Sequence, residues 1–226
     1  MTLQPQLKDI DLFLMDMDGT IYHENMIIPG TLEFFSLLQS QGKHYAFMTN
    51  NSSKSRKAYV KKLGQLGIKA TEDQIVSSVN ATIHYLNSIK MGAKIYLVGT
   101  ESLKVELQSE GFIVVPVNYR ANDVDFVLLG YDTELTYAKL VGACHYINNG
   151  VKYIATNCDL RCPIRDGRYL PDCGAFAKMI AEATGIMPQF LGKPERAMVD
   201  AAATKWNVSL DKVACVGDRL YTDIQA

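Results

Sequence analysis

The stretch Asp11-Leu-Phe-Leu-Met-Asp16-Met-Asp18-Gly-Thr20-Ile-Tyr22 joins an apolar run to two carboxylates and a glycine. An apolar run that ends in a turn signal predicts a buried strand, of the kind found in parallel sheets. Side chains alternate along a strand, so Asp16 and Asp18 can face the same way, with Cα atoms roughly 6–7 Å apart. Gly19 allows a sharp turn directly after them. The stretch therefore predicts an acidic pair at the carboxyl end of a strand, where open α/β sheets bind ligands.

A buried pair of carboxylates is costly unless a cation or a proton compensates it. Mg²⁺ is the natural candidate, because it prefers one or two carboxylates together with phosphate and water oxygens. A calcium loop starting at Asp16 is excluded, since its required Gly and Glu positions hold Ile21 and Ile27. A glycosidase pair is not favoured, because its two carboxylates normally come from separate elements. The structural alternative for Asp-x-Asp-Gly is an ordinary surface turn.

The composition is that of an ordinary globular protein. The chain has 226 residues, of which 48% are hydrophobic and 21% charged, enough for one large domain or two modest ones. A net charge of −1 gives no case for a nucleic-acid partner. Residues 1–8 are polar, and no apolar run has the length of a membrane span, so we expect neither a signal peptide nor a membrane partner. Five cysteines without paired zinc spacing favour free thiols in a reducing, cytoplasmic setting.

Apolar periodicity predicts alternating strands and helices along the whole chain. Beyond the first strand, the expected strands are residues 44–48, 94–98, 124–129, 151–156, 188–191 and 212–216. The expected helices are residues 31–41, 55–66, 80–90, 101–110, 136–148, 174–184 and 195–205, and residues 222–226 begin another. This alternation predicts an α/β fold with parallel strands and right-handed crossovers.

Four of the expected strands end in polar clusters. These are Asp16 with Asp18, Thr49 with Asn50 and Asn51, Lys193, and Asp218 with Asp223. Because the carboxyl ends of parallel strands meet at one edge of a sheet, residues remote in sequence can converge there. Taken singly, each cluster also has a structural interpretation, as a helix cap, a solvated lysine or a loop acid.

Together the clusters contain what phosphoryl transfer requires. One carboxylate can attack phosphorus and carry the phosphoryl group, and a second can protonate the leaving oxygen and later deprotonate water. Hydroxyl, amide and ammonium donors can stabilise the equatorial oxygens, and a metal ion can neutralise the remaining charge.

The order of these motifs resembles that of the haloacid-dehalogenase-like (HAD) phosphatases, and more narrowly the NagD-like, or p-nitrophenyl-phosphatase-like, branch (subfamily IIA). The motifs are Asp16-Met-Asp18-Gly-Thr20, Thr49-Asn50-Asn51, Gly192-Lys193-Pro194 and Gly217-Asp218-Arg-Leu-Tyr-Thr-Asp223. Supporting stretches are Ile28-Pro29-Gly30, Ala155-Thr-Asn-Cys-Asp159 and Pro171-Asp-Cys-Gly174-Ala175. The similarity extends over essentially the whole chain.

The resemblance implies a parallel-sheet, Rossmann-like core formed by residues 1–79 and 185–226, with an α/β cap of the C2 type inserted at residues 80–184. In this branch the cap closes over the active site and selects the leaving group. The family's core normally continues past the fourth motif with another helix and strand. We therefore expect the chain to be a piece of a slightly longer protein.

The resemblance also assigns roles to residues. Asp16 would be the nucleophile and Asp18 the acid/base, while Thr49 and Lys193 would bind the phosphoryl group, with Asn50 and Asn51 near it. Mg²⁺ would be held by the Asp16 carboxylate, the Asp18 main-chain carbonyl and Asp218, with Asp223 in support. In the cap, the candidates for substrate contact are Asn157, Asp159 and Gly174, whose alternative role is to form cap turns.

The expected function is Mg²⁺-dependent hydrolysis of small phosphomonoesters through an aspartyl-phosphate. Two alternatives stay open: a phosphotransferase or phosphomutase on the same scaffold, and a non-catalytic protein that binds a phosphorylated metabolite. The intact pair Asp16 and Asp18 argues against the second, because a sensor needs no acid/base. The substrate (a nucleotide, a sugar phosphate, phosphoglycolate or another small ester) and the oligomeric state, including a homo-oligomer, are left open by the sequence.

Overall fold

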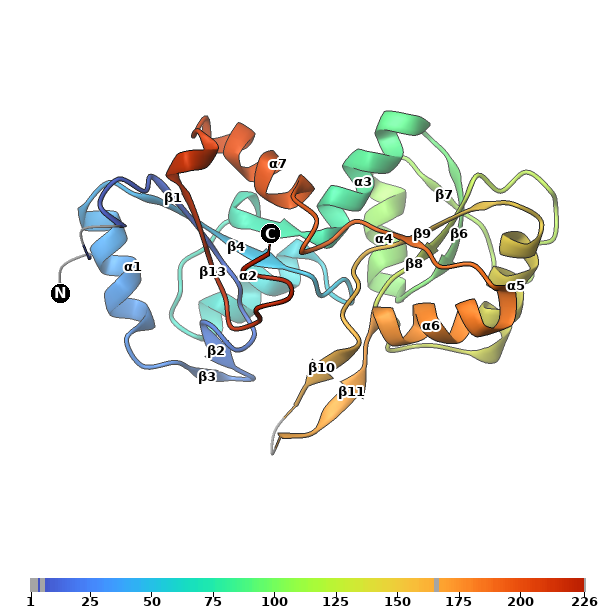
Figure 1. The fold of residues 1–226 in the computed structure, drawn as a ribbon, viewed down its shortest axis with the longest axis horizontal. Coiled ribbons are helices and arrows are strands. Elements are labelled where there is room, and N and C mark those ends of the chain that lie inside the picture. Colours follow the sequence, from blue (N-terminus) through green and yellow to red (C-terminus); the bar gives the residue numbers. More distant parts are fainter. Residues whose placement is uncertain (1–3, 5–6, 165–166, 226) are drawn as a thin grey trace. The chain divides into compact units, whose positions relative to one another are not determined.

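A computed structural model describes residues 4, 7–164 and 167–225. The chain forms two compact α/β units (Figure 1). The first unit comprises Met1–Thr49, Arg56–Ser77 and Lys193–Ala226, and the second comprises Asn50–Ser55 and Ser78–Gly192. The chain therefore passes from one unit to the other several times, and each unit is built from segments that are separated in sequence.

The first unit is built on a four-stranded sheet. Its strands are β1 (Leu12–Met15), β4 (His44–Thr49), β5 (Ile75–Ser77) and β13 (Val213–Val216), with a small antiparallel hairpin of β2 (Tyr22–His23) and β3 (Met26–Ile27). Its helices are α1 (Thr31–Ser40), α2 (Arg56–Gln65) and α7 (Ala197–Trp206), with short 3₁₀ turns η2 (Glu72–Gln74) and η4 (Leu210–Lys212). The strand order is β13-β1-β4-β5, and all neighbours run parallel.

Strand β1 is buried on both faces, which explains its unbroken apolar sequence. Phe13 and Met15 join a core cluster with apolar residues of α1 and α2. Helix α7 also contacts β1, β4 and β5 and contributes buried residues such as Met198 and Ala202 (Figure 1). The carboxyl end of β1, where the acidic pair begins, is therefore anchored in the buried core of the unit.

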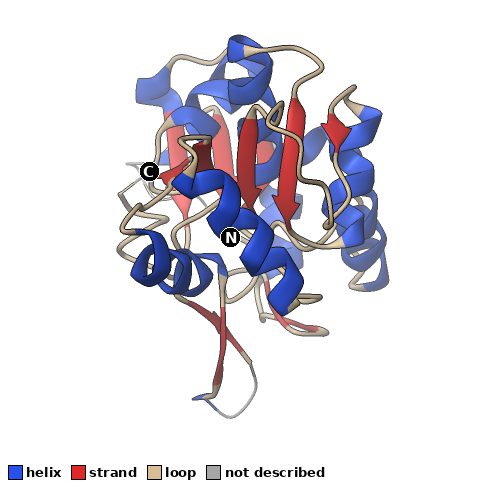
Figure 2. Ribbon diagram, turned by 90° about the vertical axis from the view of Figure 1, so that its right-hand side faces the viewer, coloured by secondary structure: helices blue, strands red, loops and turns tan. Residues whose placement is uncertain are grey.

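The second unit is built on a five-stranded sheet. Its strands are β6 (Lys94–Val98), β7 (Ile113–Val114), β8 (Phe126–Leu129), β9 (Lys152–Ala155) and β12 (Gln189–Phe190). Its helices are α3 (Ser78–Ile89), α4 (Glu101–Ser109), α5 (Tyr137–Asn148) and α6 (Cys173–Thr184). The parallel strand order is β12-β9-β8-β6-β7, and an antiparallel hairpin of β10 (Arg161–Pro163) and β11 (Tyr169–Pro171) extends away from this sheet (Figure 2).

The central strands of the second sheet place alternate side chains in two separate cores. On β8, Val127 and Leu129 pack in the core that contains α5 and α6, whereas Phe126 and Leu128 pack in the core that contains α3 and α4. This alternation is the period-2 geometry of a strand covered by helices on both faces. The second unit thus has its own three-layer α/β architecture.

Most of the expected elements are found with ends shifted by one or two residues. Strands β5 and β7 and both hairpins were not predicted, because runs of two or three residues carry too little periodicity. The expected strand before Lys193 exists as β12, but it pairs with β9 in the second sheet and not with the sheet of β1. The expected helix over residues 222–226 is wrong for residues 222–225, and residue 226 lies outside the described residues. Residues 220–225 form a series of turns. In these turns Thr222, Asp223 and Ile224 all donate main-chain hydrogen bonds to Arg219 O.

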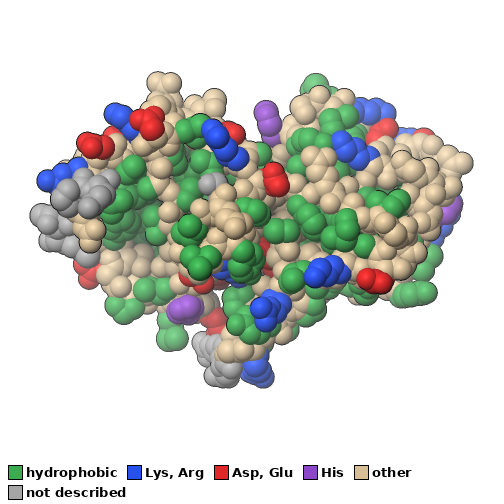
Figure 3. Space-filling view, in the orientation of Figure 1, with side chains coloured by type: hydrophobic (Ala, Val, Ile, Leu, Met, Phe, Trp, Pro, Cys, Tyr) green, Lys and Arg blue, Asp and Glu red, His purple; other side chains and the backbone are tan. Residues whose placement is uncertain are grey.

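The surface and the cysteines agree with the composition. Charged side chains of both signs are interspersed on the face shown in Figure 3. The five cysteines form no disulfide among the residues that the structure describes. Over the same described ranges, no helix combines the length and the apolar character needed to cross a membrane.

Two helical glycines with different surroundings provide a test of this packing. Gly142 in α5 lies against the Tyr96 hydroxyl, which donates to Val117 O and Ala138 O at 3.2 and 3.3 Å, and a Cβ at position 142 would overlap that hydroxyl. Gly142→Ala should therefore lower the free energy of unfolding by about 1–3 kcal/mol. Gly64 in α2 has open space around it, so Gly64→Ala should raise the free energy of unfolding by up to about 1 kcal/mol. Urea unfolding of both variants measures the difference, and equal changes would contradict the packing described for α5.

Candidate active site

The first unit brings Asp16 and Lys193 into direct contact, although they are 177 positions apart in sequence. Asp16 follows β1, and its main-chain N–H donates to Val216 O at 2.8 Å, so the backbone is still held in the sheet. Lys193 Nζ lies 2.6 Å from Asp16 Oδ1 and 3.4 Å from Met48 O. The exposed fractions of the two side chains are 3% for Lys193 and 13% for Asp16. The pair is therefore a largely desolvated, charge-assisted hydrogen bond.

Two further carboxylates complete an acidic cluster around this pair. Asp223 Oδ1 accepts a short hydrogen bond from Lys193 Nζ, and its Oδ2 accepts the Arg219 N–H at 3.1 Å. Asp16, Asp218 and Asp223 each offer an oxygen within 4.8 Å of the others. Gly19 has φ of 103° and lies against Asp218, whose carboxylate a Cβ at position 19 would overlap. The glycine after the acidic pair therefore serves both the turn and the close approach of Asp218.

The electrostatics of the cluster favour a bound cation. Burial raises the pKa of Asp16 to about 6; Lys193 opposes this increase, while Asp223 and Asp218 add to it. Burial alone would lower the pKa of Lys193, but the charges of Asp16 and Asp223 raise it above its ordinary value. Three carboxylates face one ammonium group, so the fully ionised cluster carries an excess of negative charge.

The donor set suits a hard divalent ion such as Mg²⁺, because such ions prefer carboxylate oxygens as ligands. Both oxygens of Asp223 are already engaged, by Lys193 and by the Arg219 N–H. Asp223 is therefore better suited to holding Lys193 than to coordinating an ion directly. Of the three acidic side chains, Asp16 and Asp218 are the better candidates for direct coordination, because Lys193 engages only the Oδ1 atom of Asp16.

Asp18 lies in the turn after β1 and is held by two side chains that sequence reasoning did not identify. The Tyr22 hydroxyl donates to Asp18 Oδ2, and Lys62 Nζ lies beside Asp18 Oδ1, both at 3.4 Å. Burial raises the pKa of the Tyr22 phenol, and the charge of Asp18 raises it further, so the hydroxyl keeps its proton. Tyr22 belongs to the opening motif, but nothing in the sequence connects Lys62, one of several lysines on α2, with Asp18.

Thr49 is the last residue of β4, next to β1 in the sheet, and 4% of its surface is exposed. Its Cα partner on the other side is Ser77, the last residue of β5. The carboxyl ends of β1 and β4 are therefore adjacent, as the motif order predicted. The structure brings together Asp16, Lys193, Asp218 and Asp223, while Thr49 ends the neighbouring strand β4 and Asp18 lies in the turn after β1.

The other predicted residues belong to the second unit. Asn50 and Asn157 both donate their side-chain amides to Asp159 Oδ2, at 2.8 and 3.1 Å. All three are buried, with at most 7% of their surface exposed. Asn51 Oδ1 accepts from the main chain and hydroxyl of Ser53, an arrangement typical of a loop turn. Substrate contact by these residues stays a prediction.

Gly174 stands at the start of α6 against the main chain of Cys158 and Asp159, which leaves no room for a Cβ. Its N–H donates to Asp159 O at 2.8 Å. The close approach of the two backbones explains the glycine at this position. A contact between Gly174 and a substrate likewise stays a prediction.

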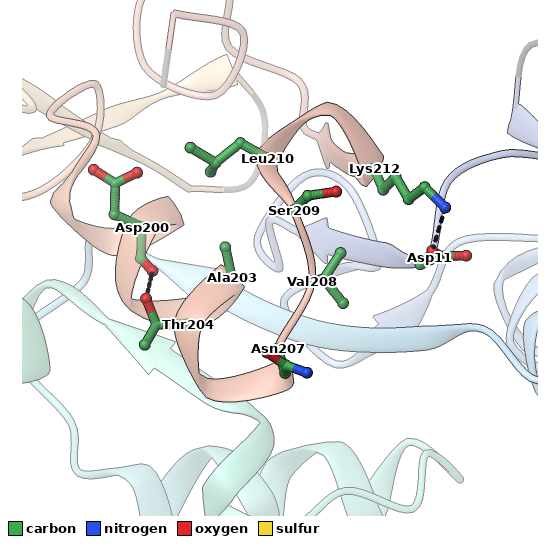
Figure 4. Close-up of a pocket in the computed structure, with 9 residues that line it drawn as sticks. All are labelled: Asp11, Asp200, Ala203, Thr204, Asn207, Val208, Ser209, Leu210 and Lys212. Atoms are coloured by element: carbon green, nitrogen blue, oxygen red, sulfur yellow. Dashed lines mark hydrogen bonds and ion pairs between the residues drawn. The ribbon is translucent and has the colours of Figure 1, made fainter.

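A separate hollow on the first unit contains none of the predicted residues. Figure 4 shows its lining, which comes from the end of α7, the following loop and the start of β1. Asp11 and Lys212, which precede β1 and β13, form an ion pair of 3.4 Å there. The hollow therefore lies at the amino ends of the strands, whereas the acidic cluster lies at their carboxyl ends.

Comparison with known proteins agrees with this geometry. Residues 13–113 match the family described as haloacid dehalogenase-like hydrolase, and residues 190–226 match one described as HAD-hydrolase-like. The acid sugar phosphatase of Staphylococcus saprophyticus is 34% identical over 220 residues, which cover 97% of this chain and 83% of the relative. The chain belongs to the haloacid-dehalogenase-like hydrolases.

Other relatives of this HAD hydrolase identify the subfamily to which it belongs. The 5′-nucleotidase YutF of Bacillus subtilis is 33% identical over 220 residues, covering 97% of the chain and 84% of the relative. The crystal structure of a 4-nitrophenylphosphatase from Thermotoga maritima matches with a TM-score of 0.91 and 38% identity, over 98% of this chain and 83% of that one. A putative NagD protein matches with a TM-score of 0.90 and 38% identity, over 96% and 84%. This HAD hydrolase is a phosphatase of the NagD and p-nitrophenylphosphatase subfamily, with a Rossmann-like core and an inserted α/β cap.

The buried amides bound to Asp159 provide a stability test in the second unit. Asp159→Ala would leave the side-chain amides of Asn50 and Asn157 without this acceptor, so we expect a loss of about 2–4 kcal/mol in the free energy of unfolding. Asp159→Asn keeps one oxygen and should lose less. Denaturant unfolding of both variants gives the two values, and an alanine variant as stable as the native chain would contradict a structural role for this acceptor.

Proposed function

We propose that this phosphatase hydrolyses small phosphomonoesters through an aspartyl-phosphate formed on Asp16. The observation that carries the proposal is the contact of 2.6 Å between Lys193 Nζ and Asp16 Oδ1, within a cluster that also contains Asp218 and Asp223. A buried carboxylate with an ammonium beside it is suited to attack phosphorus, while the ammonium stabilises the charge on the phosphoryl oxygens.

The first step transfers the phosphoryl group to the enzyme. An Asp16 oxygen forms a bond to phosphorus as the bond between phosphorus and the ester oxygen breaks. Asp18, whose side chain is 43% exposed, gives its proton to the departing alcohol oxygen. The products are the free alcohol, an acyl phosphate on Asp16 and an ionised Asp18.

The second step returns the enzyme to its starting state. Asp18 takes a proton from water, and the resulting oxygen attacks the phosphorus of the acyl phosphate. The bond between phosphorus and the Asp16 oxygen breaks, which releases inorganic phosphate and restores both carboxyl groups. Lys193 and Thr49 bind the phosphoryl group throughout, and Asp223 holds the Lys193 ammonium in place.

We assign the Mg²⁺ ligands to the Asp16 and Asp218 carboxylates and the Asp18 main-chain carbonyl. When bound, the ion would neutralise charge on the phosphoryl oxygens. Asp223 would support the site through Lys193. The excess of carboxylates over ammonium groups in the cluster supports this assignment.

Small phosphorylated metabolites are the substrate class that we propose, because similar proteins are named acid sugar phosphatase and 5′-nucleotidase. Sugar phosphates and nucleotides are therefore the first compounds to test. The near-neutral charge gives no case for a nucleic-acid partner, and five cysteines without paired zinc spacing favour a cytoplasmic enzyme. No apolar run suggests a membrane partner, and a homo-oligomer is compatible with the sequence. In the second unit, Asn50, Asn51, Asn157, Asp159 and Gly174 are the proposed substrate-binding residues.

Removal of the nucleophile tests the proposed chemistry. Asp16→Asn should lower kcat at least about 1,000-fold, because an amide cannot form the acyl phosphate. The matched control is Asp11→Asn, which changes the same residue type just before the amino end of the same strand and should keep nearly full activity. Turnover of p-nitrophenyl phosphate and the circular dichroism spectrum are measured for both. A folded Asp16→Asn enzyme with native kcat would refute the covalent route.

Metal removal tests the proposed cofactor. Excess chelator should abolish turnover, and added Mg²⁺ should restore it, because three carboxylates around one ammonium bind substrate phosphate poorly without a cation. Asp218→Asn should raise the Mg²⁺ concentration for half-maximal activity by about tenfold or more. Activity is titrated against Mg²⁺ for both proteins. Full turnover in chelator would show that the cluster needs no metal ion.

A further inference from the structure

Asp18 is held on one side by two residues that no step above uses. Each oxygen of its carboxylate has its own partner: Oδ2 accepts from the Tyr22 hydroxyl, and Oδ1 is 3.4 Å from Lys62 Nζ. The same ammonium lies 3.7 Å above the centroid of the Tyr22 ring. The three side chains therefore form a closed triangle, in which the phenol contacts the carboxylate and the ring contacts the ammonium.

Tyr22 is fixed by its own backbone. Its N–H donates to Met17 O at 3.3 Å, and its carbonyl accepts the Gly19 N–H at 2.9 Å, so residues 17–22 fold back on themselves. Asp18 and Tyr22 form an isolated bridge, and Tyr22 continues into β2, where it pairs with Ile27. None of the Tyr22 surface is exposed. The hydroxyl therefore approaches Asp18 from a rigid position.

Lys62 reaches the same carboxylate from α2. Tyr59 and Leu63, four residues apart, are the buried residues of this helix, and Lys62 stands at the edge of their stripe. Its side chain is 18% exposed, so most of its stem is covered by the unit while the ammonium reaches Asp18. Its neighbour Lys61 is exposed on the same helix.

We propose that Lys62 and Tyr22 are positioning residues that hold the Asp18 carboxyl group in the orientation needed for proton transfer. The inference rests on the proposed function, in which Asp18 protonates the leaving oxygen and then deprotonates water. Proton transfer depends on geometry, and contacts to a catalytic group are often long in the free enzyme and shorten when the substrate is bound. Two partners on separate elements restrict rotation of the Asp18 carboxylate. The Asp18 side chain is still 43% exposed, so substrate and water can reach it.

A partly exposed ion pair of this kind contributes little to folding stability, so variants of Lys62 should fold normally. Lys62→Met removes the ammonium and keeps an apolar stem, and Tyr22→Phe removes the hydroxyl and keeps the ring. Lys61→Met is the matched control on the same helix. Lys62→Arg restores a cation and should recover most of the lost activity.

The measurement is kcat/KM for two esters of different leaving-group basicity, p-nitrophenyl phosphate and glycerol 2-phosphate, with Mg²⁺ present. This parameter reports the first phosphoryl transfer, in which a basic alkoxide needs the proton from Asp18 and nitrophenolate hardly does. For Lys62→Met and Tyr22→Phe we expect about a tenfold loss with glycerol 2-phosphate and less than a threefold loss with p-nitrophenyl phosphate. Lys61→Met should change neither value.

Two outcomes would overturn the inference: an equal loss on both esters, which indicates a merely structural effect, or no loss on either. Failure of the proposed function itself gives a different result, because the native enzyme would then release phosphate from neither ester. The Asp18→Asn variant sets the scale, since its loss on glycerol 2-phosphate should exceed that of either positioning variant.

Discussion

The Lys193 ammonium group, shared by the carboxylates of Asp16 and Asp223, holds the first unit together at the carboxyl ends of its strands. Lys193, with Asp16 and Asp223, joins three segments that are far apart in sequence, and only 3% of the lysine side chain is exposed. Moving such charges out of water is expensive, and removing one partner of a buried pair typically costs about 3–5 kcal/mol. The interaction therefore constrains the turn after β13 as well as the residue after β1. The turn over residues 220–225 follows from it, because Asp223 also accepts the Arg219 N–H.

The same interaction creates the conditions for chemistry. Asp16 is desolvated enough to raise its pKa to about 6, and yet it lies beside an ammonium that favours its charged form. Asp218 approaches because residue 19 is a glycine with a positive φ. Negative charge is therefore concentrated at one end of a parallel sheet, where an arriving phosphate would be repelled without a compensating cation. The proposed binding of a metal ion and the proposed binding of phosphate would thus both follow from this one charge balance.

The sequence was sufficient for the longer helices and strands and for the convergence of Asp16, Lys193 and the late acidic loop, because long apolar runs and polar strand ends are local signals. It was insufficient where the outcome depended on tertiary pairing. Residues 188–191 read as a strand, but nothing in so short a run says that it joins β9 and not β1. Lys62 looks like any solvated helix lysine until the turn over residues 17–22 brings Tyr22 back against Asp18. The contacts of Tyr22 and Lys62 with Asp18 depend on both a backbone turn and a helix face, so residue spacing in the sequence cannot predict them.

Two carboxylates separated by one residue can have different roles because the main-chain pairing with β13 stops between them. The Asp16 N–H still donates to Val216 O in the sheet, and the Asp16 side chain, 13% exposed, points into the charged cluster. Asp18 lies beyond the sheet, in the turn, with its side chain 43% exposed and its partners coming from β2 and α2. A nucleophile benefits from a dry, fixed setting, whereas an acid that must later deprotonate water needs access to solvent. The different roles proposed for Asp16 and Asp18 thus follow from the point at which main-chain pairing stops. The sheet holds Asp16 in place, whereas Tyr22 and Lys62 hold Asp18.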